Sequence, residues 1–166
     1  MLRLALYQPD IPQNTGAMLR LGACLGVGID IIEPCGFVFT DRGLKRSALD
    51  YAAHADVSRH IDWHAFRSVT SPRRLVLLST KADRSYLDHE FTTSDTLLLG
   101  RESGGVPQEV HEAASARLRI PIREPTRSLN VALAAAMALG EALRQINGFP
   151  TSPRNSRPSP AKAGDP

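Results

Sequence analysis

Little in this sequence points to an extracellular or membrane protein. The 166 residues include two cysteines, Cys24 and Cys35, which form no CxxC pair and are too few for a disulfide framework or a zinc site. We interpret both as small buried hydrophobic side chains. No apolar run approaches the roughly 20 residues that cross a bilayer, and residues 1–7 lack the charged start and cleavage site of a signal peptide. The sequence predicts a soluble, cytoplasmic protein.

The sequence has little excess charge of either sign. With 20 Lys and Arg against 17 Asp and Glu, its net charge is +3 at pH 7, which permits nucleic-acid binding without requiring it. The basic residues are mostly arginines at element ends or in loops, and the planar arginine fork suits phosphate oxygens. For any one of them, an ordinary solvated surface residue is an equal alternative. Their shared location favours a polyanionic substrate.

Three familiar kinds of site are missing. No Lys-Ser or Lys-Thr follows Gly105, which excludes the phosphate-binding loop of nucleoside triphosphatases. Arg101 stands where the serine elbow of hydrolases needs its first glycine, so Ser103 does not predict a nucleophile. His54, His60 and His64 suggest a metal site, but a strand-to-helix break separates His60 from His64, four positions on, and no cysteine or carboxylate triad accompanies them. Surface or core histidines are the better interpretation. We therefore expect no metal site.

Apolar runs and helix signals alternate along the chain. This order predicts one domain over residues 1–149 with an α/β fold, an open and mostly parallel sheet with helices on both faces. Residues 150–166 are rich in Pro and Ser, are basic and show no apolar periodicity, so we expect a disordered tail. The predicted strands are 2–7, 29–33, 57–61, 75–79, 96–100 and 118–122, and the predicted helices are 12–26, one after Asp41, 62–69, one opened by Pro107, and 128–147.

The last predicted helix has an unusual composition. Residues 131–139 are almost unbroken Ala, Leu, Val and Met, with no polar stripe, which is typical of a helix buried all round. In a chain this small, we expect the helix to pack on the sheet on one side and on a second subunit on the other. A purely internal helix is the alternative.

Three polar segments follow apolar runs, and together they predict one composite site. Residues 97–107 form an apolar strand that enters a turn with three glycines, where missing side chains let backbone amides approach a ligand. The segment Asn14-Thr15-Gly16 with Arg20, and the segment Ile120-Pro121 with Ser128-Leu129-Asn130, have the same small and polar character.

These segments resemble the three motifs of the SPOUT superfamily of RNA methyltransferases. More narrowly, the chain is similar over residues 1–149 to the TrmL group of minimal tRNA 2′-O-ribose methyltransferases. The resemblance implies a homodimer whose C-terminal segment is threaded into a trefoil knot that holds S-adenosyl-L-methionine. It also implies methylation of the ribose 2′-hydroxyl of wobble nucleotide 34, cytidine or uridine, in the anticodon loop of tRNA, without a metal or a membrane.

The resemblance further implies which residues form the cofactor site. Most of the family's contacts are made by main-chain atoms. Leu78, Ile120 and Leu129 would supply apolar walls for the adenine. The residues here that match or complete that site are Leu78, Gly100, Glu102, Gly105, Ile120, Ser128 and Leu129.

The catalytic residues implied by the resemblance are Arg20, Asn14, Glu102 and Asn130. Arg20 would reach across the dimer to the ribose and phosphate, where a permanently protonated guanidinium is suited to orienting the phosphate and stabilising the alkoxide. Asn14 would brace the first loop, Glu102 would accept or donate hydrogen bonds, and Asn130 would tie the knot loop to the glycine-rich turn.

Some positions depart from the family pattern and leave the substrate open. Gly140, Ala132 and Gly104 stand where a tyrosine, a serine and an arginine are frequent, and Arg101 is expected to compensate for the charge missing at position 104. Two alternatives remain at this point. One is a non-catalytic dimer that binds RNA or nucleotides on the same fold, and the other is 2′-O-methylation at another tRNA or rRNA position.

Overall fold

The computed structural model of the protein describes residues 1–38, 55–70 and 73–151. The predicted helix after Asp41 lies outside this part, as does nearly all of the predicted tail. The elements that position the site all lie within it.

A seven-stranded sheet forms the centre of the molecule, in the order β3-β2-β1-β6-β4-β7-β5. All the pairings between its strands are parallel. The inner strands β1, β2 and β6 are almost completely buried, which explains why most of their residues are apolar. Asp30 in β2 and Asp95 and Thr96 in β6 are buried polar exceptions. The strands are β1 Arg3–Tyr7, β2 Gly28–Ile32, β3 Val57–His60, β4 Arg74–Leu78, β5 Arg84–Ser85, β6 Asp95–Leu99 and β7 Ala116–Arg119.

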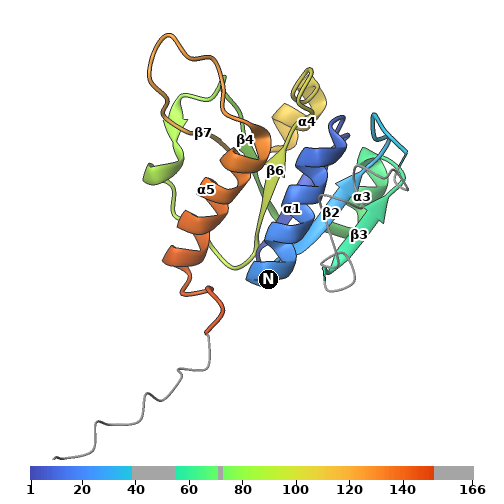
Figure 1. Cartoon of the computed structure of the whole chain (residues 1–166), viewed down its shortest axis with the longest axis horizontal. Coiled ribbons are helices and arrows are strands. Elements are labelled where there is room, and N and C mark those ends of the chain that lie inside the picture. Colours follow the sequence, from blue (N-terminus) through green and yellow to red (C-terminus); the bar gives the residue numbers. More distant parts are fainter. Residues whose placement is uncertain (39–54, 71–72, 152–166) are drawn as a thin grey trace, which may run out of the picture.

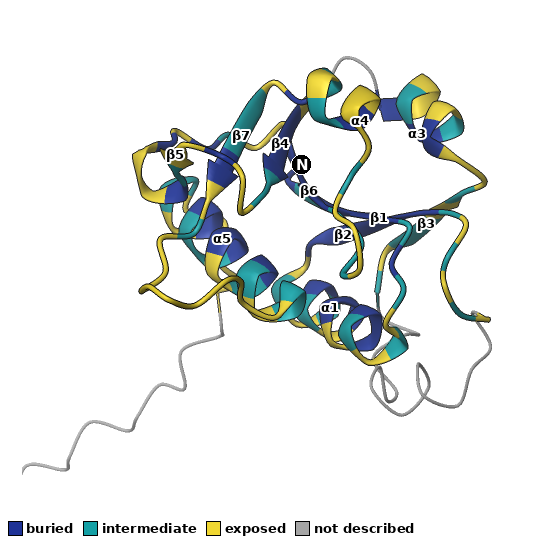
Figure 2. Cartoon of the chain, turned by 90° about the horizontal axis from the view of Figure 1, so that it is seen from above, coloured by how far each residue is buried: buried dark blue, intermediate teal, exposed yellow. Residues whose placement is uncertain are grey.

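Helices cover both faces of the sheet, as predicted (Figures 1 and 2). α1 (Pro12–Leu25) and α5 (Val131–Gln145) lie side by side on one face and enclose the larger of two core clusters. α3 (Trp63–Thr70) and α4 (Gln108–Ala113) cover the other face around Phe66 and Val110. The α/β architecture predicted from the sequence is confirmed.

Local signals in the sequence set several element ends. Gly26 ends α1 in a left-handed conformation with φ of 66°, which a glycine adopts without steric cost. Asp62 accepts a hydrogen bond from the Ala65 amide at 2.7 Å and begins α3. Both ends match the prediction.

Two predicted boundaries are wrong by three residues, and both lie next to the site. The strand predicted over 118–122 ends at Arg119, so residues 120–122 lie in a loop. The helix predicted from position 128 begins at Val131, because the Asn130 side chain caps it and accepts from the amides of positions 132 and 133. The short β5 and the 3-10 turn η2 (Tyr86–Asp88) have no periodic signal and were not predicted.

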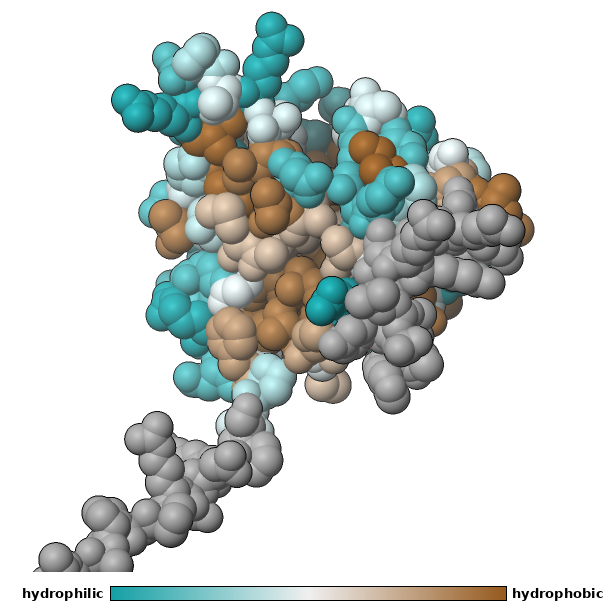
Figure 3. All heavy atoms as spheres, in the orientation of Figure 1, coloured by the Kyte–Doolittle hydropathy of each residue, from teal (hydrophilic) through white to brown (hydrophobic). Residues whose placement is uncertain are grey.

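α5 is not buried all round within the described chain. Ala135, Ala138 and Leu139 face the core, but Leu133 is 60% exposed and Met137 is 43% exposed. Figure 3 shows the resulting apolar surface over α5. The purely internal helix is therefore wrong for the part of the chain that the structure describes, which leaves this face of α5 uncovered. The buried placement of the cysteines is also wrong, since Cys24 is exposed and Cys35 is only half-buried.

Candidate functional site

Three loops meet beyond the carboxyl ends of β1, β6 and β7, and hydrogen bonds join them. The Asn14 side chain, in the first turn of α1, donates to Glu102 Oε1 at 2.9 Å. The Asn130 amide in turn donates to Asn14 Oδ1 at 2.9 Å. The structure thus places Asn14, Glu102 and Asn130 in one chain of hydrogen bonds across 116 positions of sequence.

Asp10 belongs to the same network, although sequence reasoning did not single it out. Its carboxylate accepts from the backbone amides of Glu102 at 3.1 Å and Ser103 at 3.2 Å, and also from the Ser103 hydroxyl. The hydrogen bond with the Glu102 side chain, together with these donors, lowers the pKa of Asp10 to about 2. Burial, followed by the contact with Asp10, raises the pKa of Glu102. Asp10 therefore stays ionised and fixes the start of the glycine-rich loop, residues 100–107, which connects β6 to α4.

The glycine-rich loop folds back on itself, and its conformation requires glycine at positions 100 and 105. Arg101 and Gly105 exchange backbone hydrogen bonds of 3.0 and 2.8 Å. A Cβ at Gly100 would lie 2.6 Å from the Gly105 carbonyl carbon, and Gly105 itself has a φ of 67°. A Cβ at Gly104 would meet nothing closer than Arg101 Cδ at 3.5 Å, so that position tolerates a side chain.

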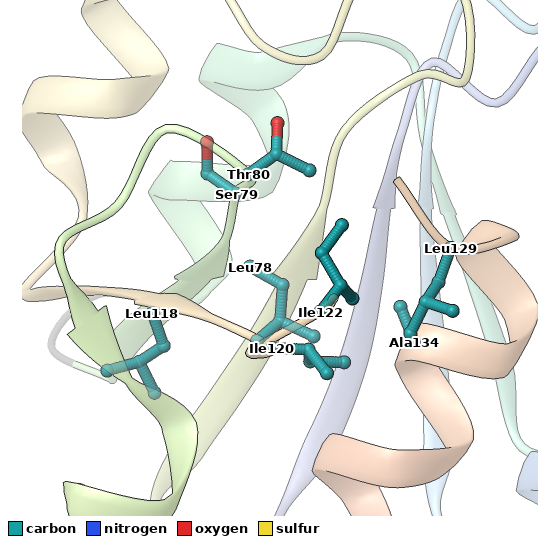
Figure 4. Close-up of a pocket in the computed structure, with 8 residues that line it drawn as sticks. All are labelled: Leu78, Ser79, Thr80, Leu118, Ile120, Ile122, Leu129 and Ala134. Atoms are coloured by element: carbon teal, nitrogen blue, oxygen red, sulfur yellow. The ribbon is translucent and has the colours of Figure 1, made fainter. Parts of the chain in front are cut away.

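An apolar cavity of about 60 Å³ lies between the end of β4 and the start of α5. In Figure 4 the side chains of Leu78, Ile120 and Ile122 gather on one side and those of Leu129 and Ala134 on the other. The volume is too small for a nucleoside but suits the edge of a flat ring held between apolar walls. The remaining lining residues are Leu118, Ser79 and Thr80.

Two larger cavities adjoin it and share its lining. One, of about 310 Å³, shares Leu129 and Ala134 with the apolar cavity. The other, of about 720 Å³, shares Ser79 and Thr80 with it. Every residue expected at the cofactor site lines at least one of the three cavities. The apolar cavity is lined by Leu78, Ile120 and Leu129, the 310 Å³ cavity by Gly100, Glu102 and Ser128, and the 720 Å³ cavity by Gly105.

Arg20 is the one predicted catalytic residue that the single chain does not bring to this site. It is exposed on α1, six positions after Asn14 and so about 9 Å further along the helix axis. It is not among the residues that line the three cavities.

His60 and His64 each lie within 4 Å of a carboxylate, and His54 lies outside the described residues. His60 Nε2 lies 2.9 Å from Asp30 Oδ1, beside Arg3. The residues that the structure describes contain no group of three or more His, Cys, Asp or Glu side chains placed to hold a metal ion. Among the same residues, no helix is long and apolar enough to span a bilayer.

Comparison with known proteins assigns this architecture to a family. The model of the SpoU rRNA methylase family matches residues 1–140. The chain belongs to this family. A relative from Beijerinckia indica, named tRNA (cytidine(34)-2′-O)-methyltransferase, is 60% identical over 148 residues, which are 88% of this chain and 92% of the relative.

Solved structures of the SpoU type have the same fold. One, described as giving structural insights into the 2′-OH methylation of C/U34 on tRNA, superposes with a TM-score of 0.85 at 41% identity, over 89% of this chain and 97% of the other. A SpoU methyltransferase from Streptomyces viridochromogenes in complex with the cofactor AdoMet superposes with a TM-score of 0.75 at 26% identity, over 87% of this chain and 60% of the other.

Proposed function

We propose that the protein transfers a methyl group from S-adenosyl-L-methionine to the ribose 2′-hydroxyl of nucleotide 34 in tRNA. The observation that carries this proposal is the 60% identity to a tRNA (cytidine(34)-2′-O)-methyltransferase across 88% of the chain. The hydrogen-bonded assembly of Asn14, Glu102 and Asn130 at the carboxyl edge of the sheet supports a catalytic role over simple RNA binding. A tRNA substrate also agrees with the cytoplasmic location that we expect from the sequence.

The described residues fit an S-adenosyl-L-methionine molecule. Gly100 and Gly105 approach each other so closely that no side chain fits between them, which leaves backbone atoms to face a ligand. Leu78, Ile120 and Leu129 would hold the adenine in the apolar cavity. Ser128 and the Gly100 backbone would face the rest of the molecule in the adjoining cavity. When bound, the cofactor supplies an electrophilic sulfonium methyl group.

The chain's own groups would orient the ribose and stabilise the charge that develops on its oxygen. Both carboxylate oxygens of Glu102 already accept hydrogen bonds, from Asn14 and from the Asp10 amide. We therefore assign Glu102 to positioning the glycine-rich loop, not to removing the proton. Arg20 of a second protomer would hold the substrate phosphate and stabilise the alkoxide, and that phosphate would accept the proton.

A homodimer and a knotted C-terminal segment complete the proposal. The exposed Leu133 and Met137 offer a second copy an apolar face on α5, and a Cβ at Gly140 on the same helix would meet open space within the chain. The path from β7 beside β4, through the exposed loop 120–130, to α5 against α1 is compatible with a trefoil knot.

A direct assay tests the activity. The purified protein, labelled S-adenosyl-L-methionine and unmodified tRNA transcripts with cytidine or uridine at position 34 are incubated, and the product is mapped by nuclease digestion and mass spectrometry. We expect a 2′-O-methyl group at nucleotide 34. A methyl group at another position would support the alternative substrate, and RNA binding without methylation of any RNA would support the non-catalytic dimer.

A further inference from the structure

The largest of the three cavities, of about 720 Å³, brings cations from three separate segments together. Lys81 follows β4, Arg101 lies in the glycine-rich loop, and Arg127 lies in the loop 120–130. The one carboxylate among its lining residues is Glu102, whose oxygens already accept from the Asp10 amide and from Asn14. The cavity therefore has an excess of positive charge that its own lining does not neutralise.

Two of these cations have no partner to hold them there. Lys81 and Arg127 are exposed, and neither side chain makes a hydrogen bond or an ion pair within the described part of the chain. Elsewhere, by contrast, Arg74 pairs with Asp95 at 2.7 Å and Arg144 with Glu141 at 2.7 Å. Like charges gathered at one cavity repel each other, so an anionic ligand would stabilise the arrangement.

Arg101 is held in place before any ligand arrives. Its guanidinium donates to Gln8 Oε1, and the Gln8 side chain donates to the Glu33 carbonyl at 3.5 Å. Gln8 has a φ of 46°, a left-handed conformation that is costly for a residue with a side chain and that is concentrated at functional sites. A guanidinium already fixed in this way loses less side-chain freedom when it binds an anion.

Neutral hydrogen-bond donors complete the lining. Ser79, Thr80 and Ser128 contribute hydroxyl groups. Arg117 Nε donates to His111 Nδ1 at 2.9 Å, so the His111 ring carries its proton on Nε2 and offers a further donor. Cations and neutral donors around one hollow match the negatively charged oxygens of a phosphodiester.

From these observations we infer that this cavity binds the sugar-phosphate backbone of the RNA next to the methylated nucleotide, through Lys81, Arg101 and Arg127. The inference rests on the proposed function, because it names the part of the tRNA that this end of the site holds. The cavity is more than twice the volume of the neighbouring 310 Å³ cavity. In Figure 1 the loop that carries Arg127 rises beside α5, and Figure 3 shows hydrophilic surface there.

The test compares K81A and R127A with R123A as a matched control. Arg123 is an exposed arginine in the same loop, but it does not line the cavity. Binding of an unmodified tRNA transcript is measured between 50 and 200 mM salt, and S-adenosyl-L-methionine binding is measured by calorimetry. We expect K81A and R127A each to weaken tRNA binding about 3- to 10-fold and to reduce the slope of log affinity against log salt by about 0.7, the value for one phosphate contact on a single strand. R123A should bind tRNA with the affinity and salt slope of the wild type. All three variants should bind S-adenosyl-L-methionine with wild-type affinity.

Two outcomes would overturn the inference. Unchanged tRNA affinity and an unchanged salt slope in both variants would show that Lys81 and Arg127 do not contact the RNA phosphates. A loss of S-adenosyl-L-methionine affinity with tRNA affinity intact would show that the cations hold the carboxylate of the methyl donor. The test of this inference is independent of the test of the proposed function. The dependence of tRNA binding on Lys81 and Arg127 can be measured even if the wild-type protein transfers no methyl group.

Discussion

Asp10 and Glu102 each donate a backbone N–H to the other's carboxylate, with N–O distances of 3.1 Å in both directions. This exchange joins the loop after β1 to the glycine-rich loop after β6. The two strands are neighbours in the sheet, so 92 positions of sequence separate groups that lie side by side. The pair fixes the shape of the loop on which the proposed cofactor site depends.

Removing the Asp10 carboxylate should loosen that loop. In D10A the amides of Glu102 and Ser103 lose their acceptor, and a lost charge-assisted hydrogen bond costs about 1.5–3 kcal/mol. We expect S-adenosyl-L-methionine binding, measured by calorimetry, to weaken by about 10- to 100-fold. D83N, at an exposed aspartate, is the control and should bind as the wild type does. Unaltered binding in D10A would show that the loop keeps its shape without the pair.

The same pair predicts a pH dependence of stability. The pKa of Asp10 falls to about 2 in the folded protein from an ordinary 3.8, so its stabilising effect is present above pH 4 and is lost as the pH falls toward 2. The pKa of Glu102 is raised, so Glu102 acts in the opposite sense and favours the folded state more below its ordinary pKa than above it. The difference in unfolding free energy between the wild type and D10N, from urea titrations, should therefore shrink between pH 5 and pH 2.5. A constant difference over that range would contradict the ionised Asp10.

The glycine-rich loop gives a matched pair of variants. G100A places a Cβ 2.6 Å from the Gly105 carbonyl carbon, whereas G104A meets Arg101 Cδ at an ordinary 3.5 Å. We expect G100A to lose measurable S-adenosyl-L-methionine binding and to lower the unfolding free energy by about 1–3 kcal/mol. G104A should stay within about 0.5 kcal/mol of the wild type in urea unfolding and should bind normally. Equal behaviour of the two variants would show that the close approach does not shape the site.

The sequence predicts the sheet well and the site only in part, for physical reasons. The strand β6 is recognisable from its apolar run Leu97–Leu99, because burial on both faces favours apolar residues on both sides of a strand, although Asp95 and Thr96 at its start are buried and polar. A two-residue strand such as β5 leaves no period to detect. Asp10 has no local signal either, since its partners Glu102 and Ser103 are distant in sequence and the contact follows from strand order alone.

The apolar face of α5 predicts a dimer that one charge can disrupt. Leu133 is 60% exposed in the single chain, so L133E costs little in a monomer but places a carboxylate in the proposed interface. Sedimentation equilibrium should show a dimer for the wild type and a monomer for L133E. L87E, at a leucine that is 58% exposed on η2, is the control and should remain dimeric. A monomeric wild-type protein in this measurement would contradict the proposal that a second copy covers α5.

Mixing two inactive variants tests whether Arg20 acts across the dimer. R20A keeps its cofactor site, because Arg20 is exposed on α1 and does not line the cavities. L129W keeps Arg20 but fills the apolar cavity with a larger side chain at a position that is already 39% exposed. We expect each variant alone to lose methylation at least about 100-fold, with R20A still binding S-adenosyl-L-methionine.

The two variants are then unfolded together and refolded as a mixture. If Arg20 serves the partner's site, a mixed dimer joins the intact cofactor site of one chain to the intact arginine of the other. About half of randomly paired dimers are mixed and each has one complete site, so about a quarter of wild-type activity should return. If Arg20 serves its own chain, neither chain can complete a site and the mixture stays inactive. Refolded wild type, carried through the same steps, sets the scale.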